Sequence, residues 1–167
     1  MELYTRKIIC MNLIFNFLSY FIGALVIFSF NLIAGVFYVI LCILTIFLSL
    51  KLRCSYCFYY GRRCGFGFGI LSKIFFSQGE SKEFNNSKNV IPVLIFSMCT
   101  SIIPVIMGII LLIVNFSVLH PIYFILYIFV AFLPNFFIRS KVCKDCEQGK
   151  LGCPAYDKIS KQSENNL

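Results

Sequence analysis

Two long apolar blocks constrain this chain more than any other feature of its sequence. Residues 8–50 and 90–138 contain no Asp, Glu, Lys or Arg, and the blocks are 43 and 49 residues long. A helix that crosses the hydrocarbon core of a bilayer needs about 20 apolar residues, so each block is long enough for two such helices and too long for one. We therefore predict an all-α membrane protein with four transmembrane helices, arranged as two hairpins, at about residues 10–30, 32–50, 92–114 and 119–138.

The composition agrees with a membrane environment. Hydrophobic residues make up 59% of the chain and charged residues 13%, whereas an ordinary soluble domain has about 25% charged residues. So few charges would not cover the apolar surface of a water-soluble particle of this size. Arg6 and Lys7 precede the first block as in a signal peptide, but the apolar stretch is too long and no small-x-small cleavage site closes it. We therefore expect the first helix to remain as an anchor.

The basic residues indicate how the helices are oriented. Two precede the first block, seven lie between residues 51 and 88, and six lie at or after residue 139, which accounts for all 15. Four crossings put these three segments on one side of the membrane, and the positive-inside rule identifies that side as cytoplasmic. The sequence therefore predicts an integral, multi-pass membrane protein with both termini in the cytoplasm.

The net charge of +8 fits the same arrangement. Basic residues that flank apolar segments can meet anionic lipid headgroups. No basic run with interleaved aromatic residues lies outside the apolar blocks, so we expect no nucleic-acid binding. The expected partners are the lipid bilayer and, through the apolar helix faces, other membrane proteins.

Few polar residues interrupt the apolar blocks. The absence of acidic and basic side chains from the predicted helices disfavours an ion-coupled transporter. Pro104 is expected to kink the third helix, with neighbouring helices satisfying the backbone that it frees. Four asparagines are expected near helix ends, where they would cap turns or reach lipid headgroups: Asn12, Asn16, Asn31 and Asn115.

Two cysteine motifs follow the two predicted hairpins. They share the pattern C-x2-C-x6-C, and the second begins 89 residues after the first: Cys54, Cys57 and Cys64, then Cys143, Cys146 and Cys153. A hairpin, basic residues and a cysteine motif thus occur twice in the same order, which is typical of an internal duplication.

This spacing is typical of metal ligation. Two residues between cysteines let both sulfurs face one ion from a tight turn, as in zinc knuckles and iron–sulfur loops. Glycines give each loop the backbone freedom to bring back the third cysteine: Gly61, Gly65, Gly67 and Gly69, then Gly149 and Gly152. We therefore predict that the six cysteines form a cysteine-rich cap on the cytoplasmic face, which binds zinc or an iron–sulfur cluster.

Three ligand arrangements are open at this point. Each triplet could hold its own metal, with a fourth ligand from water, Asp145, Glu147 or a substrate. All six thiolates could share a binuclear cluster. A single four-thiolate site could instead join the halves through the paired cysteines of both motifs: Cys54, Cys57, Cys143 and Cys146. The one histidine, His120, is predicted at the far side of the membrane and is excluded as a ligand.

These features favour a membrane-embedded binding or scaffold protein, whose metal site ties the two hairpins together. The alternative is a membrane redox protein that carries electrons through an iron–sulfur cluster or reactive dithiols. Cys10, Cys42 and Cys99 lie in the apolar blocks and are expected to be small buried side chains. No catalytic residue is identified, so the sequence leaves open whether the protein is an enzyme.

The remaining segments complete a single-domain organisation. Residues 1–156 are expected to form one polytopic membrane domain with cysteine loops at 51–89 and 139–156, and residues 157–167 a disordered tail. Within the first loop, Phe66, Ile70, Ile74 and Phe75 recur at helical spacing. This pattern predicts an amphipathic segment on the inner leaflet.

Overall fold

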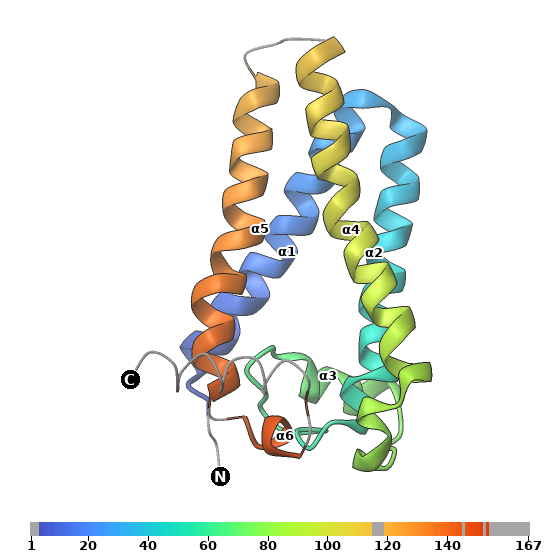
Figure 1. Ribbon diagram of the computed structural model, residues 1–167, viewed down its shortest axis with the longest axis vertical. Helices are drawn as coiled ribbons and strands as arrows, with labels where there is room; N and C mark the ends of the chain where they lie inside the picture. Colours follow the sequence, from blue (N-terminus) through green and yellow to red (C-terminus); the bar gives the residue numbers. More distant parts are fainter. Residues whose placement is uncertain (1–3, 115–118, 145, 152, 154–167) are drawn as a thin grey trace.

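The chain folds into four long helices with a layer of short elements at one end (Figure 1). The structure is a computed structural model that describes residues 4–114, 119–144, 146–151 and 153, without the side chains of residues 119, 133–141, 144 and 150. The long helices are α1 (Arg6–Phe30), α2 (Leu32–Leu52), α4 (Ser87–Val114) and α5 (Leu119–Lys144). Over the described residues the chain is all-helical and contains no strand.

Three of these helices are long and apolar enough to cross a membrane: α1, α4 and the helix that begins at Leu32. In α5, the apolar stretch with described side chains is His120–Phe132. The helices match the predicted ranges but continue past the apolar residues, since α4 begins at Ser87 and α5 ends at Lys144. Adding one residue to an existing helix gains a backbone hydrogen bond at little further cost, so helices extend beyond their apolar segments.

Asn31 alone separates α1 from α2. Its backbone is extended, with φ −157° and ψ 133°, and its side-chain oxygen accepts hydrogen bonds from the N–H groups of Ile33 at 2.8 Å and Ala34 at 3.4 Å. This is an N-cap for α2, and it confirms the predicted turn near Asn31. Most of the second predicted turn, residues 115–118, lies outside the described residues, as does the predicted tail at 157–167.

A junction of buried residues joins all four long helices. Tyr38, Pro104 and Tyr127 surround Gly23 of α1, where an added Cβ atom would lie 2.7 Å from the Tyr38 hydroxyl and 3.1 Å from the other two side chains. Pro104 has no N–H, so the carbonyl of Thr100, four residues earlier, loses its helical partner. The Tyr38 hydroxyl donates to that carbonyl at 3.0 Å. A neighbouring helix thus satisfies the backbone that Pro104 frees, as predicted.

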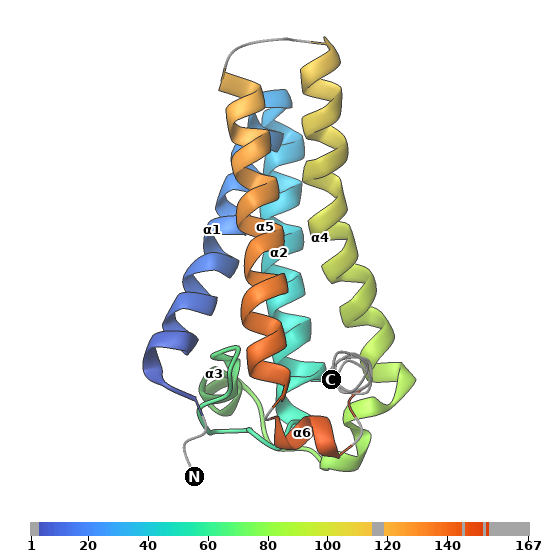
Figure 2. The same cartoon turned by 60° about the vertical axis from the view of Figure 1, so that its left-hand side comes forward.

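The opposite end of the bundle from the Asn31 turn carries four short elements. They are η1 (Cys54–Tyr56), α3 (Phe68–Phe75), η2 (Ser81–Asn85) and α6 (Glu147–Lys150). We call these short elements, together with the loops that adjoin them, the loop layer. The first residues of α1 and α4 and the last residues of α2 and α5 border this layer (Figures 1 and 2). Consequently, every Lys and Arg whose side chain is described lies in or beside the loop layer.

Candidate functional site

The two cysteine pairs adopt the same local turn at the ends of two long helices. The N–H of Cys57 donates to the carbonyl of Cys54 at 3.3 Å, and the N–H of Cys146 donates to the carbonyl of Cys143 at 3.3 Å. The third cysteines differ. Cys153, three residues after α6 (Glu147–Lys150) ends, donates its N–H to the carbonyl of Gly149 at 3.1 Å. The repeated spacing therefore corresponds to repeated backbone geometry at the pairs but not beyond them.

A closed glycine loop holds Cys64, the third cysteine of the first motif. The N–H of Gly61 donates to the carbonyl of Gly69 at 2.9 Å and closes this loop. A Cβ atom on Gly69 would overlap the backbone carbonyl oxygens of Tyr59 and Arg62, so the close approach requires glycine at this position. Gly69 also donates its own N–H to the Cys64 sulfur at 3.3 Å.

One backbone N–H group donates to a motif sulfur, that of Gly69 to Cys64. Such a bond is stronger to a thiolate than to a thiol, so it favours the charged, metal-binding form of cysteine. The backbone N–H groups of Tyr59 near Cys57, and of Gln148 and Gly149 near Cys146, act in the same direction and lower the pKa of these thiols.

Two hydrogen bonds connect the motifs directly. The N–H of Phe58 donates to the side-chain oxygen of Gln148 at 2.7 Å, and Gln148 is only 3% exposed. The N–H of Glu147 donates to the Tyr59 hydroxyl oxygen at 3.2 Å. Residues about 90 positions apart in the sequence are therefore held together, and α6 is fixed against the first motif.

A small buried cluster lies beneath these bonds. It consists of Tyr4, Tyr59 and Val142, and the Tyr4 hydroxyl donates to the Val142 carbonyl at 2.7 Å. Tyr4 precedes α1, and Val142 belongs to the last turn of α5. The cluster therefore joins the start of α1 and the end of α5 to the first motif. Three cysteines from both motifs pack against it: Cys57, Cys64 and Cys146.

Burial controls the protonation of these thiols. It raises the pKa of Cys57 to about 11, with a further increase from the neighbouring Cys64 and Cys146 thiols and an opposing effect of the Tyr59 N–H. Burial also raises the pKa of Cys146, against the effect of the N–H groups near its sulfur. Both cysteines are therefore neutral thiols at neutral pH unless a cation is added.

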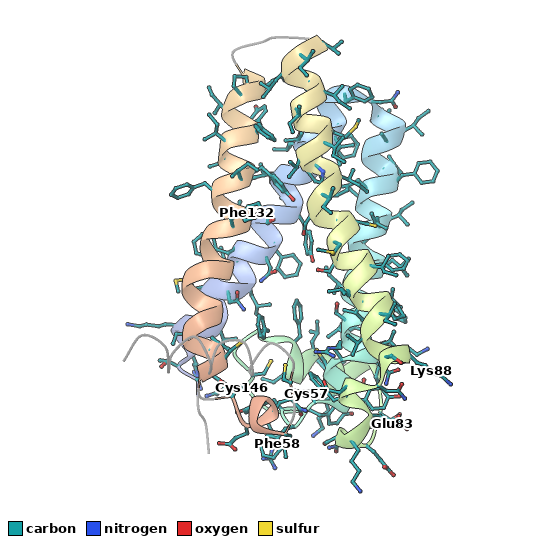
Figure 3. All side chains as sticks on the ribbon, in the orientation of Figure 1. Cys57, Phe58, Glu83, Lys88, Phe132 and Cys146 are labelled. Atoms are coloured by element: carbon teal, nitrogen blue, oxygen red, sulfur yellow. The ribbon has the colours of Figure 1, made fainter. Side chains whose placement is uncertain are left out.

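Cys54 and Cys153 lie in the same layer, whereas Cys143 lies in the last turn of α5. Cys54 interacts electrostatically with Cys57 and Cys64, and Cys146 interacts with Cys153. Arg53 interacts with thiols of both motifs and stacks on the Phe84 ring at 3.9 Å. Figure 3 shows Cys57 and Cys146 at the same level of the loop layer.

The sulfurs share one layer without converging on one point. Among the described residues, no three His, Cys, Asp or Glu side chains lie close enough together to hold a metal ion as they stand. None of the nine cysteines forms a disulfide bond. His120 lies in the first turn of α5, at the opposite end of the bundle from the loop layer (Figure 1).

Several polar and sulfur-containing side chains differ from expectation. Asn12 does not reach toward headgroups: it is 4% exposed and donates to the carbonyl of Gly65 at 3.2 Å, which anchors the Cys64 loop to α1. Cys42 is buried as expected, but Cys10 and Cys99 are exposed, so that prediction was wrong for two of the three. The i, i+4 spacing of Asn12 and Asn16 within an apolar helix was the available signal for a polar inner face.

No known protein family, curated protein or solved structure gives a significant match to this chain.

Proposed function

We propose that the chain is a multi-pass membrane protein whose loop layer binds a metal ion, in the first place zinc, through cysteine thiolates of both motifs. One observation carries the proposal: two motifs far apart in the sequence meet in one layer, where two hydrogen bonds join them, three of their cysteines pack against one buried cluster, and the Gly69 N–H donates to the Cys64 sulfur. Backbone donors to cysteine sulfur are the outer-sphere contacts that orient and stabilise thiolate ligands.

Cys57 is the centre of the proposed ligand set. It interacts with Cys64 of its own motif and with Cys146 of the other, and all three pack against one buried cluster. A tetrahedral zinc site takes four ligands, and Cys54 and Cys153 are the neighbours available for the fourth position. Ion binding would draw these sulfurs together from their separate positions by rotation of the short cysteine side chains. The turns that carry Cys57 and Cys146 are already closed by backbone hydrogen bonds to Cys54 and Cys143.

The thiol pKa values favour metal binding over dithiol redox chemistry. Reactive cysteines have a lowered pKa, because the thiolate is the nucleophile. Here burial raises the pKa of Cys57 and of Cys146. A divalent cation supplies the positive charge that the buried thiolates lack, and its binding displaces their protons.

The metal would act as a crosslink between the two halves of the chain. The loop layer has little core of its own, with three buried apolar residues beneath the cysteines. Small segments of this kind are commonly stabilised by a structural metal. We therefore assign the protein a binding or scaffold role, in which the metal fixes the end of the first hairpin against the end of the second.

The membrane arrangement rests on the helices and the charges. Three helices are long and apolar enough to cross a bilayer. We infer that α5 is the fourth crossing, since its 26 residues span about 39 Å at 1.5 Å per residue, against a hydrocarbon core of about 30 Å. Four crossings leave the basic loop layer on one side, and the positive-inside rule makes that side, with both termini, cytoplasmic.

The test is the metal content and visible spectrum of protein purified anaerobically in detergent. We expect colourless protein with stoichiometric zinc, and loss of zinc in Cys57→Ser and in Cys146→Ser. Cys10→Ser and Cys99→Ser are matched controls outside the motifs and should keep the metal. Iron with visible absorbance that bleaches on reduction would instead support the redox alternative. Absence of metal, together with freely titratable thiols, would overturn both the zinc site and the iron–sulfur cluster and would leave dithiol chemistry or simple packing.

A further inference from the structure

A partly open polar cavity of about 130 Å³ lies between α1, α4 and α5, next to the loop layer. Side chains from α1, α4 and α5 line it, together with Phe66 from the Cys64 loop. Its polar lining residues are Asn12, Asn16, Ser19, Tyr20, Ser97 and Ser101. A cluster of hydrogen-bonding groups inside an apolar helix bundle is costly without a partner for it, so this cavity is a candidate binding site.

The cavity is bounded at both ends by defined contacts. Toward the loop layer, Asn12 bonds to the carbonyl of Gly65, which places Phe66 at the cavity wall. Toward the junction, the Tyr127 hydroxyl donates to the carbonyl of Ser101 at 3.1 Å. Between these contacts α1 and α4 diverge toward the loop layer, as the ribbon shows (Figure 1). The cavity is thus part of the fold and does not depend on the proposed metal ion.

The hydrogen bonds within the wall leave both acceptors and donors available, since the Tyr20 and Ser97 hydroxyls donate to no acceptor among the described residues. The amide nitrogen of Asn16 donates to the carbonyl of Asn12 at 2.8 Å and to its side-chain oxygen at 3.3 Å. The hydroxyl of Ser101 donates to the carbonyl of Ser97 at 2.9 Å. The side-chain oxygen of Asn16 and the lone pairs of the serine hydroxyls remain to accept bonds. None of the described lining residues is charged.

We propose that this cavity binds a small uncharged aromatic molecule with a hydroxyl donor, of the class of phenols. Its volume is close to that of a cavity of about 150 Å³ known to hold one benzene molecule. Phe15, Tyr20 and Phe66 provide ring faces and edges for a planar ligand. The free acceptors and the Tyr20 and Ser97 hydroxyls match a ligand hydroxyl, which donates one hydrogen bond and can accept others. A charged ligand would find no described counter-charge in the wall.

The test uses 4-fluorophenol and fluorobenzene as fluorine-NMR probes on the full chain in detergent. We expect saturable binding of 4-fluorophenol and at least tenfold weaker binding of fluorobenzene, which has the ring without the donor. Asn16→Leu should weaken 4-fluorophenol binding at least tenfold, because it fills the cavity and removes the acceptor. Phe17→Leu, at a neighbouring exposed position, is the matched control and should bind like the wild type.

Other outcomes are decisive as well. Equal partitioning of both probes into all variants, or a cavity that holds water and no probe, would overturn the proposal. If Asn16→Leu does not fold, Ser97→Ala takes its place, and unchanged affinity in that variant would count against the site. Displacement of 4-fluorophenol by 4-octylphenol would indicate a ligand that enters from the lipid phase. Binding of 4-fluorophenol without such displacement would indicate a free small molecule, and both results retain the site.

Discussion

At the residue scale, Tyr38 replaces a single backbone donor that Pro104 removes. Its hydroxyl bonds to the carbonyl of Thr100, and Tyr38 is 3% exposed, so Tyr38→Phe would leave a buried acceptor without this partner. We expect a loss of about 1–2 kcal/mol in the free energy of unfolding, measured in mixed detergents. Pro104→Ala restores the missing N–H, so the same Tyr38→Phe change should cost less in that background. Equal costs in both backgrounds would show that the hydroxyl does not serve this carbonyl.

The raised pKa of Cys57 predicts how the stability of the metal-free protein depends on pH. Its folded pKa of about 11 lies above the unfolded value near 8.5, so between these values the unfolded chain binds fewer protons. Stability is therefore unaffected below about pH 8.5 and falls as the pH rises toward 11, by roughly 2–3 kcal/mol for this group.

Unfolding at pH 8 and pH 10.5 in the presence of a chelator measures this effect. Cys57→Ser should lose less stability between these two pH values than the wild type. Zinc-loaded protein should lose little as well, because its thiolates are already deprotonated. An identical pH dependence in wild type and Cys57→Ser would mean that Cys57 titrates normally.

At the element scale, the loop around Cys64 depends on Gly69. Gly69→Ala would push a methyl group against two backbone carbonyls and disturb the N–H bond to the Cys64 sulfur. We expect a loss of roughly 1–3 kcal/mol from overpacking and at least tenfold weaker zinc binding, measured by competition with a chromophoric chelator. Far-UV circular dichroism should show that the long helices remain. Ser77→Ala, at an exposed position just after α3, should change neither quantity, and zinc binding by Gly69→Ala at wild-type strength would remove Cys64 from the ligand set.

The sequence predicted where the helices lie better than it predicted which faces they bury. The turn at Asn31 followed from a polar interruption of an apolar run, and the amphipathic spacing around Ile70 and Ile74 matches the short helix α3. By contrast, α1 is apolar on nearly all sides, so apart from the i, i+4 pair Asn12 and Asn16 no periodicity marks its inner face. Asn12 was therefore assigned to the membrane surface and Cys10 to the interior, whereas the structure buries Asn12 and exposes Cys10.

At the scale of the whole molecule, two long helices precede the first cysteine motif and two more separate it from the second. This even number already implies that both motifs meet at one end of the bundle. The positions of the sulfurs within that end were not predictable, because they depend on contacts between residues far apart in the sequence. Gln148 reaching Phe58 and Tyr4 reaching Val142 are such contacts. Spacing can identify the ligands of a site, but the choice among ligand sets depends on how the loops fold against each other.

The proposed four-crossing arrangement leads to the last prediction, which reporter cysteines can test. Leu32 and Val114 are 71% and 75% exposed and lie at the end of the bundle away from the loop layer, whereas Lys82 lies within that layer. In cells that express the chain, Leu32→Cys and Val114→Cys should react with a membrane-impermeant maleimide. Lys82→Cys should react only after permeabilisation, and the unmodified chain is the control for its own nine thiols.

Labelling of Cys153 in the second motif decides whether the two motifs can share a metal. If α5 crosses the membrane, Cys153 stays protected in intact cells together with Cys64, and a site that includes Cys57 and Cys146 is geometrically possible. If Cys153 reacts from outside while Lys82→Cys does not, α5 does not cross. The bilayer would then separate the motifs, so a metal crosslink between the hairpins would be ruled out whatever metal the purified protein contained.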